Sequence, residues 1–144
     1  MDFAVVRAGV ADVRREPNHS SERVNQAMFG ETVTVDKQKQ GFVEATQFDG
    51  YRGWIDRRLV REISGADFNS LSEPDVTVSV PWTRPRRGAG QGTEMPWILY
   101  FGTPLSIGAE STYGYHPVRW PGDEELWVRG GHVRPLPPTG VPPL

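Results

Sequence analysis

The chain has 144 residues and a formal net charge of −2, and 37% of its residues are hydrophobic. This charge balance lacks the positive field on which most nucleic-acid binders depend, so composition argues against a nucleic-acid partner. The chain contains no cysteine, which excludes disulfides, thiolate metal ligands and a cysteine nucleophile within these residues. Glycine and proline number 16 and 13, which favours short strands joined by tight turns over a helical bundle.

Apolar and polar residues alternate along the first half of the chain, as they do in half-buried strands. The alternation covers residues 33–35 and 42–45, and each segment predicts a strand. Asp49-Gly50 lies between the second of these segments and the run 51–55. Because glycine accepts a positive φ, this dipeptide predicts a hairpin turn.

Three segments show no clear periodic pattern of apolar residues. Residues 21–29 are predicted to form an irregular loop that leads into a strand. The polar segment 61–74 predicts a connection without a helix. The proline-rich residues 134–144 are expected to be extended, in the polyproline II conformation.

An internal duplication is the most informative feature of the sequence. Phe-Gly opens FGETVTV in the first copy and FGTPLSI in the second. In each copy a glycine follows the phenylalanine after 21 residues and a tryptophan follows after 25 or 26: Phe29, Gly50 and Trp54 in the first, Phe101, Gly122 and Trp127 in the second. Matching landmarks at matching spacing predict two homologous modules.

The predicted fold is all-β, with two small barrels of five or six short strands joined by a polar linker. The expected boundaries are 1–62 for the first barrel, 63–75 for the linker, 76–136 for the second barrel and 137–144 for the proline-rich tail. Modules this short bury only about 60% of their unfolded surface, so large aromatic residues are expected to fill their cores. Trp54 and Trp127 are predicted to be buried rather than to stack on a ligand.

Three segments of the first copy carry motifs of a known family: VADVRREPNHSSERVNQAMFGETVTV, GFVEA and DGYRGWIDRRLV. They resemble the bacterial SH3 domain (SH3b). In particular they look like the first of two SH3b domains that precede the catalytic domain in NlpC-type cell-wall cysteine peptidases. The resemblance covers about residues 5–60. The second copy resembles the second SH3b domain less closely, because it has the insertion RRGAGQGTEMP and lacks an equivalent of Gly53-Trp54-Ile55. The resemblance implies two SH3-like barrels in tandem.

Those peptidases are γ-D-glutamyl-L-diamino-acid endopeptidases that cut the stem peptides of murein. The resemblance implies that this chain is their non-catalytic region, which positions the peptidase and admits substrates with a free N-terminal L-alanine. The family's catalytic cysteine and histidine are missing, and the sequence stops in a proline-rich linker of the kind that leads to the catalytic domain. We therefore expect an NlpC-type catalytic domain as partner, in the same chain or lost, a murein peptide or peptidoglycan fragment as ligand, and no hydrolase activity.

The resemblance also implies substrate-binding residues. In the family a tyrosine and an acidic residue of the first SH3b domain contact the free amino end of the substrate. The tyrosine matches Tyr51, and Glu22 is the expected acid, with Glu16 as the reserve. A phenol offers a rigid ring with a polar tip, and a carboxylate pairs with an ammonium group through a charge-assisted hydrogen bond. The alternative is that Tyr51 is an exposed turn aromatic and Glu22 a solvated loop acid.

The second copy has more aromatic residues than so small a barrel can bury. Some of them are expected to form an interface with the catalytic domain or to line a ligand groove. The candidates are Trp82, Trp97, Tyr100, Tyr113, Tyr115 and Trp120.

No metal or cofactor is expected. The three histidines, His19, His116 and His132, are far apart in the sequence and lack the spacing of a zinc site. No segment reaches the ~20 apolar residues of a membrane helix, and the N-terminus lacks the pattern of a secretory signal. The expected location is the cytoplasm, with the cell envelope as the alternative.

Two other functions fit the same sequence. The first is a stand-alone module that binds peptidoglycan or a protein through its exposed aromatic residues. The second is a structural scaffold without a small ligand. Binding to insoluble murein separates a targeting module from a substrate gate.

Overall fold

The computed structural model describes residues 1–89, 93–109, 113–122 and 124–137. The chain divides into two compact units, Met1–Glu73 and Pro74–Leu144. Of the predicted proline-rich tail, every residue after Pro137 lies outside the described residues.

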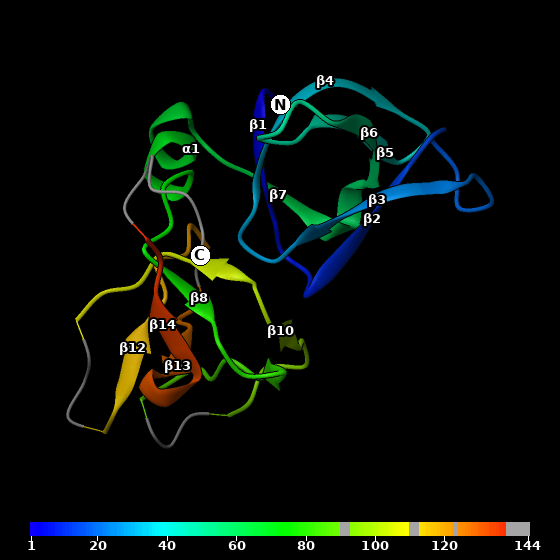
Figure 1. Cartoon of the computed structure of the whole chain (residues 1–144). Helices are drawn as coiled ribbons and strands as arrows, with labels where there is room; N and C mark the ends of the chain where they lie inside the picture. Colours follow the sequence, from blue (N-terminus) through cyan, green and yellow to red (C-terminus); the bar gives the residue numbers. More distant parts are fainter. Residues whose placement is uncertain (90–92, 110–112, 123, 138–144) are drawn as a thin grey trace. The chain divides into compact units, whose positions relative to one another are not determined.

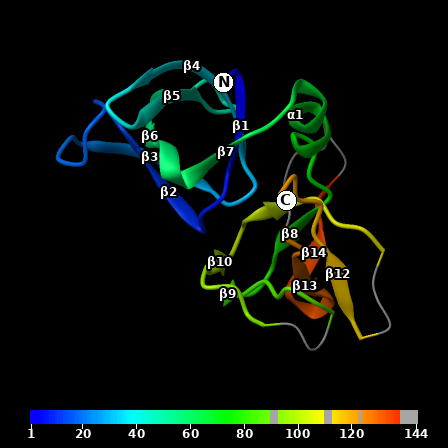
Figure 2. The same ribbon diagram turned by 180° about the vertical axis from the view of Figure 1, so that it is seen from behind.

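The first unit contains one antiparallel sheet of seven strands in the order β3-β2-β6-β5-β4-β1-β7 (Figure 1). The strands are β1 (Phe3–Val6), β2 (Val10–Arg14), β3 (Arg23–Met28), β4 (Thr32–Lys39), β5 (Phe42–Thr46), β6 (Arg52–Asp56) and β7 (Val60–Glu62). The sheet curls strongly, and Figure 2 shows the same curvature from behind. Its edges, β3 and β7, are not paired with each other, so the sheet is SH3-like but does not close into a barrel, and it has seven strands rather than the five or six that we predicted.

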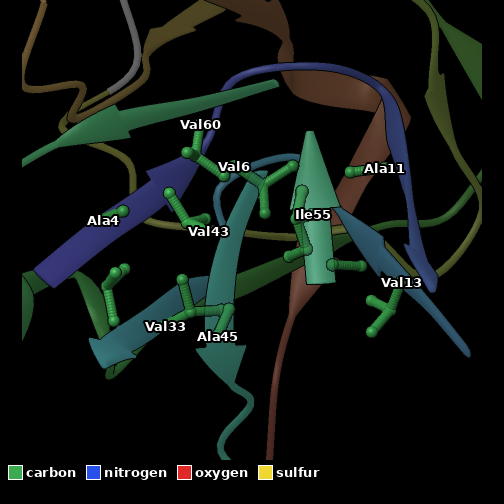
Figure 3. Close-up of a cluster of buried hydrophobic side chains, with 11 residues drawn as sticks. Ala4, Val6, Ala11, Val13, Val33, Val43, Ala45, Ile55 and Val60 are labelled. Carbon is green, nitrogen blue, oxygen red and sulfur yellow. The ribbon is translucent and has the colours of Figure 1, made fainter. Parts of the chain in front are cut away.

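The core of this unit lies on the inner face of the curled sheet (Figure 3). Alternate residues of β2 and the matching positions of the other strands point inward, as the period of two requires. The cluster consists of small aliphatic residues: Ala4, Val6, Ala11, Val13, Ala27, Val33, Val35, Val43, Ala45, Ile55 and Val60. Small side chains suit this position because the curved sheet brings its own strands close together on the inside.

Trp54 is not part of that core, contrary to our prediction. Its neighbours Gly53 and Ile55 are buried and point inward, so Trp54 lies on the outer face of β6 and is only partly buried. Gly53 allows β6 to approach β2 closely. A Cβ added there would lie 2.4 Å from Cγ1 of Val13 and 3.0 Å from the carbonyl oxygen of Arg14.

A short helix, α1 (Gly65–Leu71), lies within the segment predicted to be an irregular connection. Ser64 is its N-cap and accepts a hydrogen bond from the backbone N–H of Asp67. The ring of Phe68 contacts that of Phe3 on β1, with centroids 4.7 Å apart. The helix therefore belongs to the first unit and packs on its sheet.

Strand β3 also corrects a prediction, because residues 21–29 were expected to form an irregular loop. It pairs with β2 from Val10 opposite Met28 to Arg14 opposite Arg23, with a register shift near Arg14. β3 is an edge strand without alternating burial, so it carries no period-two signal in the sequence.

The second unit is built of shorter strands. They form a three-stranded sheet in the order β11-β8-β14 and two pairs, β10-β9 and β12-β13. Their bounds are β8 (Val76–Val78), β9 (Trp82–Thr83), β10 (Leu99–Tyr100), β11 (Pro104–Leu105), β12 (Tyr115–Pro117), β13 (Trp127–Arg129) and β14 (Val133–Pro135). The 3₁₀ turn η2 (Gly130–His132) joins β13 to β14, as η1 (Arg57–Leu59) joins β6 to β7 in the first unit.

The duplicated sequence positions form matching backbone hydrogen bonds in the two units. Gly30 N–H donates to Val6 O at 2.9 Å, and Gly102 N–H donates to Val78 O at 2.9 Å. Both glycines have a positive φ, +81° and +88°, which favours glycine at this turn. Three further pairs match: Arg7 N–Leu59 O with Ser79 N–His132 O, Phe29 N–Gly9 O with Phe101 N–Pro81 O, and Glu31 N–Met28 O with Thr103 N–Tyr100 O. The sequence repeat is thus also a repeat of backbone geometry.

Side chains at equivalent positions have diverged. Phe29 is 1% exposed, whereas its counterpart Phe101 is 58% exposed. Trp127 is partly buried rather than a core residue, and its indole N–H donates to Glu125 Oε1 at 2.7 Å. The prediction of tryptophan-centred cores is therefore wrong for both units.

Candidate functional site

Tyr51 follows a tight turn that holds its backbone in place. Gly50 N–H donates to Gln47 O, Gln47 N–H donates to Tyr51 O at 2.8 Å, and Gly50 has a φ of +87°. The carboxylate of Asp49 accepts from Tyr51 N–H at 3.1 Å. The predicted Asp-Gly turn is confirmed. It leaves Tyr51 40% exposed on a backbone that is fixed at both ends.

A buried polar network lies behind this turn. The side chain of Gln47 is buried, and its Nε2 donates to Glu31 Oε1 at 2.8 Å and to Gln26 O at 3.3 Å. Its Oε1 accepts from Asn25 Nδ2 at 2.9 Å. Gln47 therefore ties the Tyr51 turn to β3 and to the start of β4, and sequence reasoning did not single it out.

Glu22 and Glu16 lie in the loop that joins β2 to β3, residues 15–22, which we call the β2–β3 loop. Oε2 of Glu22 accepts from Nε of Arg15 at 3.1 Å, and both side chains are largely exposed. Exposed ion pairs are worth about 0–1 kcal/mol, so a ligand cation can replace this one at little cost. The backbone N–H of Glu16 donates a hydrogen bond to Ser21 Oγ at 2.9 Å, within the same loop.

The structure places the predicted residues in one unit, in two separate connections between strands. Among the described residues, no hydrogen bond joins Tyr51 to Glu22 or Glu16. The link between their two segments is β3, which begins one residue after Glu22 and contacts the Tyr51 turn through Asn25. The roles of these three residues stay predictions.

A second polar cluster, which sequence reasoning missed, lies at the end of β6. The buried carboxylate of Asp56 accepts from Nη2 of Arg58 at 2.8 Å and lies 3.1 Å from Nε2 of His19, a residue of the β2–β3 loop. The side-chain hydrogen bond from Arg58 is the largest cause that lowers the pKa of Asp56, and burial opposes it. The His19 ring also contacts Phe42, with centroids 4.9 Å apart.

The candidate interface aromatics of the second unit differ in exposure. Trp82 and Tyr100 lie opposite each other on β9 and β10, and both are exposed, as is Tyr113. Tyr115 is buried and accepts from Nη2 of Arg129 at 3.1 Å, so its position does not suit an interface. The remaining two candidates, Trp97 and Trp120, are partly buried and lie with their ring centroids 6.5 Å apart.

The other two histidines bind groups of their own unit. His116 Nδ1 lies 2.9 Å from Gly108 O, and His132 Nδ1 lies 2.8 Å from Thr83 Oγ1. Within the described residues, no three or more histidine, cysteine or acidic side chains are grouped so that they could hold a metal ion. In the same part of the chain, no helix has the length and apolar character needed to cross a membrane.

The stability of the second unit is predicted to depend on pH through His132. Burial, followed by the charge of Arg129, lowers the pKa of His132 below its ordinary value of 6.5. The folded state thus binds the proton less readily than the unfolded state, so the stability from neutral His132 is full above pH 6.5 and falls as the pH drops toward the lowered pKa.

This dependence is measurable by urea unfolding between about pH 8 and pH 5, followed by tryptophan fluorescence. Four of the five tryptophans are in the second unit. The variant His132→Asn, whose amide can hydrogen bond to Thr83 without titrating, is expected to lose less stability on acidification. Equal losses for the two proteins would contradict the assignment to His132.

Comparison with known proteins finds a family model that matches most of the first unit. Residues 9–61 match the family model of the bacterial SH3 domain, so the predicted SH3b domain is confirmed for this part of the chain. No curated protein matches the chain.

Among solved structures, the chain is similar to an NlpC/P60 family protein from Bacillus cereus, with a TM-score of 0.73 and 16% identity. The match covers 93% of this chain and 56% of that chain, so the present sequence spans little more than half of its structural neighbour. NlpC2 and NlpC1 from Trichomonas vaginalis also match, each with a TM-score of 0.39 and 12% identity over 92% of this chain and 47% and 45% of theirs. The Bacillus cereus match is evidence for the fold.

Proposed function

We propose that the chain consists of two SH3b domains in tandem and is the accessory region of a murein-peptide endopeptidase of the NlpC type. The family match supports the first domain directly. The second domain is supported by the repeated hydrogen bonds around Gly30 and Gly102 and by a fold match that extends over 93% of the chain. The chain has no cysteine, so thiolate attack on the peptide would belong to a separate catalytic domain.

The proposed role of the first domain is to admit substrates with a free N-terminal L-alanine. The observation that carries this role is the Tyr51 turn, which presents a half-exposed phenol on a backbone fixed by Gln47 and Asp49. A rigid aromatic residue loses little entropy when it binds a ligand. Glu22 supplies an exposed carboxylate for the ammonium group, with its weak ion pair to Arg15 as the only competitor among its recorded contacts.

The second candidate is a stand-alone module that binds peptidoglycan strands or a protein. The exposed pair Trp82 and Tyr100, which lie opposite each other on β9 and β10, favours it, and Phe101, the residue after β10, is exposed as well. Such surfaces are typical of binding sites. In this case no peptidase would be attached.

The two candidates differ in which ligand they bind. A substrate gate is expected to bind the soluble tripeptide L-Ala-γ-D-Glu-diaminopimelate in calorimetry and to stay in the supernatant when sedimented with insoluble murein. A targeting module is expected to sediment with murein and not to bind the tripeptide. Binding to murein alone would overturn the proposed gate, and a Trp82→Ala variant that no longer sediments would then locate the surface responsible.

A further inference from the structure

One side chain connects the middle of the β2–β3 loop to β6, the strand next to β2, and to β5 beyond it. His19 Nε2 lies 3.1 Å from Asp56 Oδ2, and the His19 ring rests against Phe42. Phe42 and Asp56 are directly opposite each other on β5 and β6. Their side chains therefore project from the same face of the sheet, and His19 covers the pair.

The two residues of the contact between His19 and Asp56 differ in exposure and in their other partners. The side chain of His19 is 63% exposed, whereas that of Asp56 is 8% exposed. Arg58 donates to both carboxylate oxygens of Asp56, at 3.1 and 2.8 Å, and the backbone N–H of Arg58 donates to it as well. Asp56 is thus a charged acceptor whose orientation does not depend on His19.

The remaining bonds of the loop join it to itself or to its base. Glu16 N–H donates to Ser21 Oγ, and Ser20 Oγ donates to Asn18 Oδ1. Arg14, at the end of β2, donates to Ser21 O at 2.7 Å. These bonds set the local shape of the loop, but among the described interactions only those of His19 hold its middle against β5 and β6.

We propose that His19 is a positioning residue that fixes the β2–β3 loop, and with it Glu22, relative to the sheet. The Nε2–H of an imidazole can donate a hydrogen bond to a carboxylate, as the distance between His19 and Asp56 allows. The role at the ligand rests on the proposed function, because Glu22 is the carboxylate proposed to meet the ammonium group. A loop that is already fixed loses less conformational entropy when a ligand binds to it.

The test compares His19→Ala, His19→Gln and the loop control Ser20→Ala in the full chain. Hydrogen exchange of the loop amides is the first measurement. In His19→Ala the amides of Glu16 and of residues 18–22 are expected to exchange about tenfold faster, since one charge-assisted hydrogen bond and a ring contact are lost. Thermal unfolding of the first unit is expected to change little, because Asp56 keeps Arg58.

The glutamine variant separates positioning from general damage. Its Nε2 can donate to Asp56, so it is expected to recover most of the loop protection. Ser20→Ala removes one exposed hydrogen bond within the loop and is expected to speed exchange much less than His19→Ala does. Unchanged exchange in His19→Ala, or equal loss in the alanine and glutamine variants, would overturn the role of His19.

Titration with the tripeptide L-Ala-γ-D-Glu-diaminopimelate is the second measurement. His19→Ala is expected to weaken binding about tenfold and His19→Gln by less. If the original chain does not bind the tripeptide, the proposed gate fails while the exchange data still decide whether His19 holds the loop. If the original chain binds and His19→Ala binds equally well, the positioning role at the ligand is wrong.

Discussion

Replacing Gly53 by alanine is expected to destabilise the first unit by about 2–3 kcal/mol, near the upper end of the range for overpacking a core. The added Cβ would lie 2.4 Å from Cγ1 of Val13 and 3.0 Å from a backbone carbonyl oxygen, that of Arg14. Val13 is fully packed in the core, and the backbone of β2 is held by its pairing with β3. Neither neighbour can move without separating β2 from β6.

Gly65→Ala is the matched control for this substitution. A Cβ at Gly65 would make one ordinary contact, 3.5 Å from the ring of Phe3, and the residue is the first of α1. Alanine is expected to be neutral there or to stabilise the unit by a few tenths of a kcal/mol up to about 1 kcal/mol. Urea unfolding of both variants checks the pair. Equal stability of Gly53→Ala and Gly65→Ala would mean that β6 does not approach β2 as closely as described.

Gln47→Leu is expected to cost the first unit about 2–3 kcal/mol, because it removes three side-chain hydrogen bonds in a buried site. Oε1 of Glu31 and Nδ2 of Asn25 would both lose a partner. The Glu31 carboxylate keeps only its bond from Met28 N–H among its recorded bonds. The substitution also loosens the connection between β3 and the turn that carries Tyr51. The affinity for the tripeptide is therefore expected to fall together with the stability.

The same substitution at Gln26 is the control. Gln26 is exposed on β3, and its side chain makes one long hydrogen bond, to Asp12 at 3.3 Å. Gln26→Leu is expected to change the free energy of unfolding by less than about 0.5 kcal/mol. Similar losses for the two variants in denaturant unfolding would show that the buried network contributes no more than a surface hydrogen bond.

The features predicted from the sequence are those with local or repeated signals. Asp49-Gly50 identifies its turn because glycine takes the positive φ that the turn requires. The spacing of Phe29, Gly50 and Trp54 matches that of the second copy, and matching hydrogen bonds occur around Phe29 and Phe101. Such signals depend on a few neighbouring residues and survive divergence of the rest.

The missed features depend on contacts between distant residues or on signals too short to stand out. Helix α1 has only seven residues, and its capping pair, Ser64 and Asp67, was the one sequence signal for it. The orientation of Trp54 follows from the close approach at Gly53, which a single sequence does not reveal. His19 and Asp56 are 37 positions apart in the sequence, and no local pattern joins them.

The central claim is that the first domain recognises a free ammonium group at the end of a murein peptide. Its most direct test is calorimetric titration of the chain with L-Ala-γ-D-Glu-diaminopimelate and with the same peptide acetylated at its amino end. We expect the free peptide to bind and its Kd to rise at least about tenfold after acetylation, with Glu22→Gln and Tyr51→Phe reducing that difference. Equal affinity for the two peptides, or a difference that persists in both variants, would contradict it.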